Sequence, residues 1–121
     1  MIVLDASALL AFLQGEAGAD RVEQLLLDGA VCGAANWSEV AQKVRGAGKD
    51  WELARSLLAS YELAVEPVIQ DDGEWAAQRW VRGEGLSLAD RLCLALGNRR
   101  DADIWTADQA WGAHKRVHQI R

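Results

Sequence analysis

The sequence has few of the features that mark linkers, exported proteins or membrane proteins. It contains one proline, Pro67, and no stretch rich in Gly, Ser and Pro, so we expect a single domain over residues 1–121. The longest uninterrupted apolar run, residues 8–13, is too short to cross a bilayer. Only two cysteines occur, Cys32 and Cys93, and their apolar surroundings predict buried thiols and not a disulfide framework.

The first residues also lack the basic segment and the small-residue cleavage site of a signal peptide, so we expect a cytoplasmic protein. Half of the residues (50%) are hydrophobic and 26% are charged, which excludes intrinsic disorder and predicts a folded core. The formal net charge of −5, taken alone, argues against a nucleic-acid partner, because nucleic acids favour basic proteins.

Short β-branched runs alternate with segments of helical periodicity. The predicted extended segments are residues 2–4, 30–33, 63–65, 103–106 and 116–120. The predicted helices lie near residues 6–13, 19–28, 37–46, 50–62, 75–80 and 87–96, with a short one from 108. This alternation predicts an α/β fold, a three-layer α/β/α sandwich around a mainly parallel sheet of about four to five short strands.

Four carboxylates are expected at the carboxyl edge of this sheet, where open α/β sheets bind ligands. Asp5 directly follows the first strand and Asp108 comes just after the fourth. Glu39 and Asp90 are predicted in the first turns of helices that begin at the same edge. The four acids, although far apart in sequence, are therefore expected to converge.

Each acid also has a purely structural explanation. Ser87-x-x-Asp90 has the form of a capping box, and Asn36-x-x-Glu39 has the same form with Asn as the cap. Asp5 and Asp108 are equally suited to cap helices. Helix capping does not predict, however, that the acids gather at one edge.

Two hydroxyls, those of Ser7 and Thr106, accompany these acids two residues away. Carboxylates held close together repel each other, and a divalent cation removes that repulsion. A ligand set made of oxygen alone favours a hard ion, Mg²⁺ or Mn²⁺.

The segments that carry these residues resemble the motifs of PIN-domain ribonucleases, above all the small toxins of VapBC toxin–antitoxin pairs. The matching segments are Asp5-Ala6-Ser7, Ser38-Glu39-Val40, Leu86 to Arg91 and Thr106-Ala107-Asp108. The sequence departs from the pattern at Ala89, where glycine is frequent, and in its six tryptophans.

The resemblance implies metal-dependent endonucleolytic cleavage of RNA, with an acidic Mg²⁺ or Mn²⁺ site and two supporting hydroxyls. It assigns the acidic site to Asp5, Glu39, Asp90 and Asp108, and the hydroxyls to Ser7 and Thr106. It also implies a cognate antitoxin that blocks the site and a toxin homodimer; the short apolar runs, for their part, predict no membrane partner.

Charge is unevenly distributed along the chain. Residues 1–74 hold 13 acids and 5 Lys or Arg, whereas residues 75–121 hold 5 acids and 8 Lys or Arg. We hypothesise that Arg79, Arg82 and Arg91 contact RNA phosphates, the alternative being a solvated helix face.

The tryptophans are candidates for core, for stacking on RNA bases or for a protein interface. Trp37 and Trp105 lie in apolar patterns that favour the core. Trp51, Trp75 and Trp80 have polar neighbours, which favours a protein interface.

Three other interpretations stay open. A phospho-acceptor signalling domain needs an acidic pair after the first strand, where Asp5 stands alone. A haloacid-dehalogenase-like phosphatase needs a second Asp at the position of Ser7. A housekeeping RNA-processing nuclease would share the whole site with a toxin, although the compact chain favours the toxin.

Overall fold

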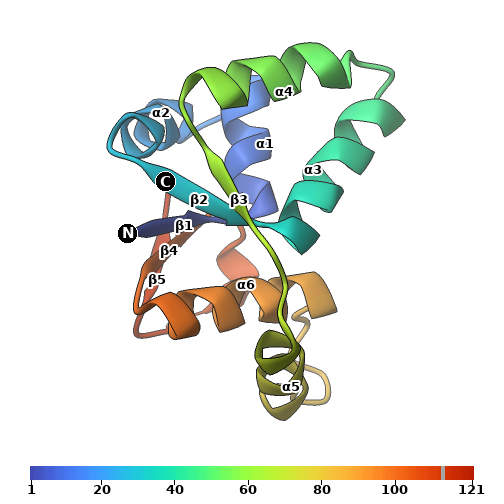
Figure 1. Cartoon of the computed structure of the whole chain (residues 1–121), viewed down its shortest axis with the longest axis vertical. Helices are drawn as coiled ribbons and strands as arrows, with labels where there is room; N and C mark the ends of the chain where they lie inside the picture. The colour runs from blue at the N-terminus through green and yellow to red at the C-terminus, as the bar shows by residue number, and fades with distance from the viewer. Residues whose placement is uncertain (113) are drawn as a thin grey trace.

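A parallel five-stranded sheet forms the centre of the molecule, with its strands in the order β3-β2-β1-β4-β5 (Figure 1). The computed structural model describes residues 1–112 and 114–121. The strands are β1 (Ile2–Leu4), β2 (Ala30–Gly33), β3 (Ala64–Glu66), β4 (Asp103–Thr106) and β5 (Val117–Gln119). The helices are α1 (Ala6–Gln14), α2 (Ala19–Leu27), α3 (Ala34–Gly46), α4 (Trp51–Ser60), α5 (Gln70–Gln78) and α6 (Leu88–Arg100), with a 3₁₀ turn at Gln109–Trp111.

The predicted three-layer architecture is confirmed. Figure 1 shows α1, α2 and α4 on one side of the sheet and α5 and α6 on the other. Alternate residues of β1 face opposite layers, as the pleat of a strand requires. Leu4 packs into the core beneath α1 to α4, whereas Val3 packs into a second core beneath α6. Both cysteines are buried, as predicted.

Helix α6 lies very close to the sheet at Gly97. A Cβ atom at this position would overlap the side chain of Ile104 on β4. The absence of a side chain therefore allows α6, which carries Asp90 at its amino end, to settle directly on the strand that leads to Thr106.

Three local predictions are wrong. The helix expected near residues 75–80 begins five residues earlier, at Gln70, and ends at Gln78, so Trp80 lies beyond it.

Helix α3 begins at Ala34 with Gly33 as its N-cap, so Glu39 lies in the second turn and Asn36 is not a cap. The core supplies the reason, because Asn36 is turned inward and is only 1% exposed.

Trp51, expected at a protein interface, is instead buried. Its ring meets that of Trp37 edge to face, with 5.1 Å between the ring centroids. This contact fills the space between α3 and α4, which explains an aromatic residue at the start of a helix with an otherwise polar beginning.

Among the described residues, no helix is both long and apolar enough to span a bilayer.

Candidate active site

The carboxyl ends of β1 and β4 meet where the strand order reverses. The chain proceeds outward from β1 to β2 and β3, and then returns to place β4 on the other side of β1. Such a switch point leaves a crevice between the loops that follow the two strands, and open α/β sheets bind ligands there. Asp5 follows β1 at this point, and Thr106 ends β4.

Asp5 is a buried carboxylate held by three neighbouring groups. The Thr106 hydroxyl donates to Oδ2 at 2.6 Å, and the Ala8 backbone N–H donates to Oδ1 at 2.9 Å. The Ser7 hydroxyl lies 2.8 and 2.9 Å from the two oxygens. Asp5 is also the N-cap of α1, so its structural and its chemical explanations both apply.

The backbone after β4 supports the two hydroxyls. The Ala107 N–H donates to Ser7 Oγ at 2.9 Å, and the Asp108 N–H donates to Thr106 Oγ1 at 3.0 Å. Each of these bonds occupies one lone pair of a hydroxyl oxygen, and both hydroxyls lie within donating distance of the Asp5 carboxylate. The predicted grouping of Asp5 with Ser7 and Thr106 is therefore present.

Burial raises the pKa of Asp5 to about 6, even though its hydrogen bonds act in the opposite direction. The negative charge of Asp90 raises it further. A carboxylate whose charge is so poorly solvated gains strongly from a nearby cation.

Glu39 and Asp90 lie within electrostatic range of each other. Desolvation, followed by the charge of Asp90, raises the pKa of Glu39. Burial and the charges of Asp5, Asp90 and Glu39 all raise the pKa of the thiol of Cys93, a fully buried residue of α6. Asp90 therefore lies within electrostatic range of both Asp5 and Glu39.

Asp108 is placed differently. Its carboxylate is exposed and caps the 3₁₀ turn, where Oδ1 accepts from the Ala110 N–H at 2.9 Å. It lines a hollow of about 310 Å³ together with Ser7, Lys43 and Arg121. Asp108 therefore borders the site through its backbone bond to Thr106, while its side chain faces this neighbouring hollow.

Two residues that sequence reasoning did not assign to the site belong beside it. Asn36 donates from Nδ2 to Glu39 Oε1 and to the Ala89 carbonyl, both at 3.3 Å, and so links α3 to the start of α6. Lys43 partly offsets the raised pKa of Glu39. Their spacings of three and four residues from Glu39 on one helix face were the available signal.

The chemistry of this donor set fits a hard divalent cation, because all the side-chain ligands are oxygens and the central one is desolvated. The buried Oδ1 of Asn36 has no hydrogen-bond partner in the described structure, and it lies next to Gly33 at the end of β2. In the described part of the chain, no three or more Asp, Glu, His or Cys side chains lie close enough together to coordinate one metal ion.

The three arginines proposed for RNA contact differ in how firmly other groups of the protein hold their side chains. Arg79 forms a bidentate ion pair with Glu84 at 2.7 and 2.9 Å, and Arg91 donates to the Ala76 carbonyl at 2.6 Å. Arg82 is exposed and lies over the ring of Trp80, itself half exposed. Arg91 therefore has a structural contact, whereas Arg82 reaches solvent.

The family model of the PIN domain matches residues 2–117. The chain belongs to the PIN domain family. Membership of this family argues against the phospho-acceptor and phosphatase interpretations. Together with the similar solved structures described next, it supports a nuclease. A comparison with curated proteins finds no match.

Solved structures share the fold at low sequence identity. A toxin–antitoxin complex from Klebsiella pneumoniae matches with a TM-score of 0.78 and 17% identity, over 100% of this chain and 98% of that one. The Mycobacterium tuberculosis toxin VapC20, described as cleaving the sarcin–ricin loop, matches with a TM-score of 0.71 and 18% identity, over 89% and 90% of the two chains.

Proposed function

We propose that residues 1–121 form one nuclease domain that hydrolyses RNA phosphodiester bonds endonucleolytically with Mg²⁺ or Mn²⁺. The observation that carries this proposal is the buried Asp5 carboxylate, held by Ser7 and Thr106 at the switch point with Glu39 and Asp90 in electrostatic range. Such an acidic centre suits phosphodiester chemistry, in which charge develops on the phosphate and on the leaving oxygen.

Asp5, Glu39 and Asp90 would hold the cation, and Asp108 would complete the acidic set from the neighbouring hollow. The bound ion supplies an activated water and offsets charge on the phosphate. The protein fixes the geometry: the strand behind Asp5 and its hydrogen bonds hold that carboxylate in place. The hydrogen bond from Asn36 Nδ2 orients the Glu39 carboxylate.

The metal site also accounts for the acidity of the chain. Without the four proposed site acids, 14 acidic residues face 13 basic ones. Most of the net charge of −5 thus belongs to the site and is offset once cations bind, so the acidic composition does not exclude an RNA substrate.

The direct test is cleavage of purified RNA by the wild type and by Asp5→Asn, with Mg²⁺, with Mn²⁺ and with EDTA. We expect metal-dependent cleavage by the wild type and a loss of at least a hundredfold in Asp5→Asn. Asp103→Ala is the matched control, because Asp103 is an exposed carboxylate at the opposite end of β4. Cleavage that persists in Asp5→Asn would remove the assignment of the site.

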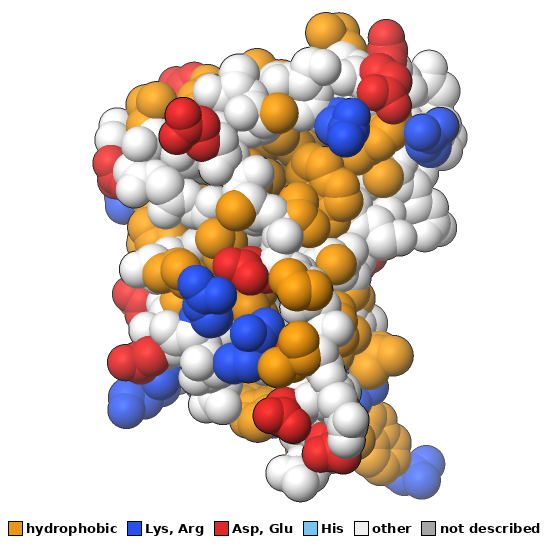
Figure 2. Space-filling view, in the orientation of Figure 1, with side chains coloured by type: hydrophobic (Ala, Val, Ile, Leu, Met, Phe, Trp, Pro, Cys, Tyr) orange, Lys and Arg blue, Asp and Glu red, His pale blue; other side chains and the backbone are white. Residues whose placement is uncertain are grey.

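We further propose that the nuclease is the toxin of a toxin–antitoxin pair. The similarity to the Klebsiella complex over the whole chain supports this role. Exposed apolar side chains also gather around α4, where Leu53 is 69% and Leu57 43% exposed. Figure 2 shows hydrophobic side chains in a hollow bordered by α3, α4 and β3. An antitoxin would cover such surfaces.

The toxin role is tested by induced expression of wild type and Asp5→Asn in growing cells, with and without the product of a small adjacent reading frame. We expect growth arrest with the wild type alone. RNA cleavage in vitro without growth arrest would favour the housekeeping nuclease instead.

We also propose a homodimer, which the half-exposed Trp80 supports as an interface anchor. Sedimentation of the wild type against Trp80→Ala measures it, and a wild-type monomer at all concentrations would exclude it.

A further inference from the structure

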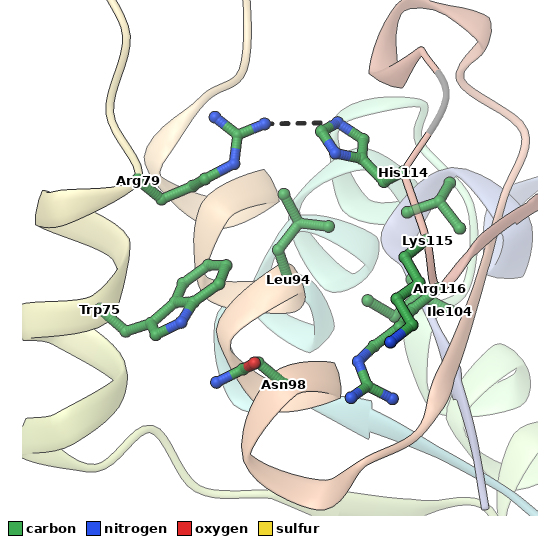
Figure 3. Close-up of a pocket in the computed structure, with 9 residues that line it drawn as sticks. Trp75, Arg79, Leu94, Asn98, Ile104, His114, Lys115 and Arg116 are labelled. Atoms are coloured by element: carbon green, nitrogen blue, oxygen red, sulfur yellow. Dashed lines mark hydrogen bonds between the residues drawn. The ribbon is translucent and has the colours of Figure 1, made fainter.

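A second cavity, separate from the acidic site, lies between α5, α6 and the segment that leads into β5. It has a volume of about 340 Å³. In Figure 3, Arg79 and His114 face each other at one end, and Trp75 and Asn98 stand across from Lys115 and Arg116. Leu94 and Ile104 form an apolar floor. The sequence motifs described above do not account for this cavity.

The rim of the cavity is cationic. Arg79 and Arg116 are held in place by ion pairs with Glu84 and Asp101, at 2.7 and 2.6 Å. Lys115 is exposed and forms no ion pair among the described residues, so its charge is available to an incoming anion. The rim also belongs to residues 75–121, the part of the chain with an excess of basic residues.

The walls offer contacts for a planar ring with polar edges. Trp75 is half-buried, and its indole projects from α5 toward the cavity (Figure 3). Asn98 is exposed on α6, and its amide supplies both a donor and an acceptor. Aromatic and basic side chains in combination are the general means of binding single-stranded nucleic acid, by base stacking and phosphate contact.

Two elements connect this cavity with the acidic site. Asp90, Leu94 and Asn98 follow one another at four-residue intervals along α6, which corresponds to about 6 Å per step. On β4, Ile104 and Thr106 are two residues apart and so face the same side, about 7 Å from each other. The cavity therefore begins about one extended nucleotide away from the level of Asp90 and Thr106.

We propose that this cavity, which we call the flanking-nucleotide pocket, binds a nucleotide of single-stranded RNA next to the one that is cut. The base stacks against Trp75 with Asn98 at its edge, and Lys115 contacts the adjoining phosphate. This inference rests on the proposed ribonuclease function. The pocket adds affinity and sequence preference, while the reaction itself takes place among the acids.

The test measures binding of a mixed-sequence RNA hexamer in metal-free buffer over a range of salt concentrations. Lys115→Gln should flatten the slope of log Kd against log salt by about 0.7, the value for one phosphate contact on a single strand. Lys49→Gln, the same substitution at an exposed lysine between α3 and α4, should leave the slope unchanged. Unchanged slopes in both variants would overturn the phosphate contact.

The stacking contact is tested at Trp75. Trp75→Leu should weaken hexamer binding about tenfold, and Trp75→Phe should restore most of the loss because a phenyl ring still stacks. In the wild type, the Trp75 indole N–H resonance should shift when the hexamer is added. This measurement needs no variant, so a fixed resonance overturns the pocket even if Trp75→Leu folds poorly.

The kinetic readout separates this inference from the proposed function. With Mg²⁺, Lys115→Gln and Trp75→Leu should raise KM several-fold and leave kcat within about twofold of the wild type. If the wild type cleaves RNA and both variants keep its KM, the pocket is rejected but the ribonuclease function is not. Absence of wild-type cleavage rejects the ribonuclease, whereas the binding and resonance measurements still decide whether the pocket takes RNA.

Discussion

The Thr106 hydroxyl donates a 2.6 Å hydrogen bond to Asp5 Oδ2 and so joins the ends of two adjacent strands that are 101 residues apart in sequence. Asp5 depends on this bond because its carboxylate is only 3% exposed and has little access to water. Thr106 is itself fully buried. The pair is therefore part of both the core and the proposed catalytic centre.

Thr106→Val should destabilise the protein and impair the site together. Removal of the hydroxyl leaves a buried carboxylate oxygen without its strongest donor, which costs about 1–3 kcal/mol. We expect urea denaturation to show this loss and RNA cleavage to fall at least tenfold. Thr106→Ser retains the hydroxyl and should keep most of the activity. Equal activity of the valine and serine variants would show that the bond does not matter.

Asp5 should make the metal-free protein less stable as the pH rises. Its pKa is about 6 when folded and 3.8 ordinarily, so between these values the folded state holds a proton that the unfolded chain has lost. The stabilisation is complete below about pH 4 and is lost through pH 6, a change of about 3 kcal/mol. Denaturation of wild type and Asp5→Asn at pH 4 and pH 7 measures it, because only the wild type should show this component.

Mg²⁺ should raise the melting temperature of the wild type, because a bound cation offsets the cost of burying the charge of Asp5 beside Asp90. Asp5→Ala should show a much smaller increase. Calorimetry without Mg²⁺ and at Mg²⁺ concentrations that differ tenfold measures the melting temperature of both proteins. Equal increases in the two proteins would contradict a shared carboxylate site.

Gly97→Ala should destabilise the protein by about 1–3 kcal/mol, because the new Cβ overlaps Ile104 and pushes α6 away from β4. Gly73→Ala provides the matched control. It places the same methyl group in open space on helix α5 and should stabilise by about 0.5–1 kcal/mol. Thermal unfolding of both variants separates a packing effect from a helix-propensity effect.

The sequence predicted the strands best where short β-branched runs end abruptly. Residues 2–4, 30–33 and 103–106 are strands with the expected bounds. Their parallel direction could also be inferred, because helical crossovers connect parallel strands, whereas the strand order β3-β2-β1-β4-β5 was not predicted. The start of α3 was missed because Gly33 gives a weak N-cap signal, whereas Asn36 gives a strong but misleading one.

Side-chain positions at the sheet edge were predicted less well than the elements that carry them. The placement of Asp5, Glu39 and Asp90 on elements that begin at the same edge follows from topology, which the sequence pattern predicts. The direction of the Asp108 carboxylate depends on the 3₁₀ turn after it, and the burial of Trp51 depends on its contact with Trp37. Such contacts between distant segments leave no periodic trace in the sequence.

The central position of β1 has a consequence for synthesis of the protein. β1 is made well before one of its two neighbours, β4, because β2, β3 and six helices lie between them in the sequence. The Asp5 carboxylate therefore has no Thr106 partner until 101 further residues have been made, and long-range parallel pairing of this kind is slow. A nascent chain interrupted before residue 106 lacks Thr106 and cannot hold the Asp5 carboxylate in this way.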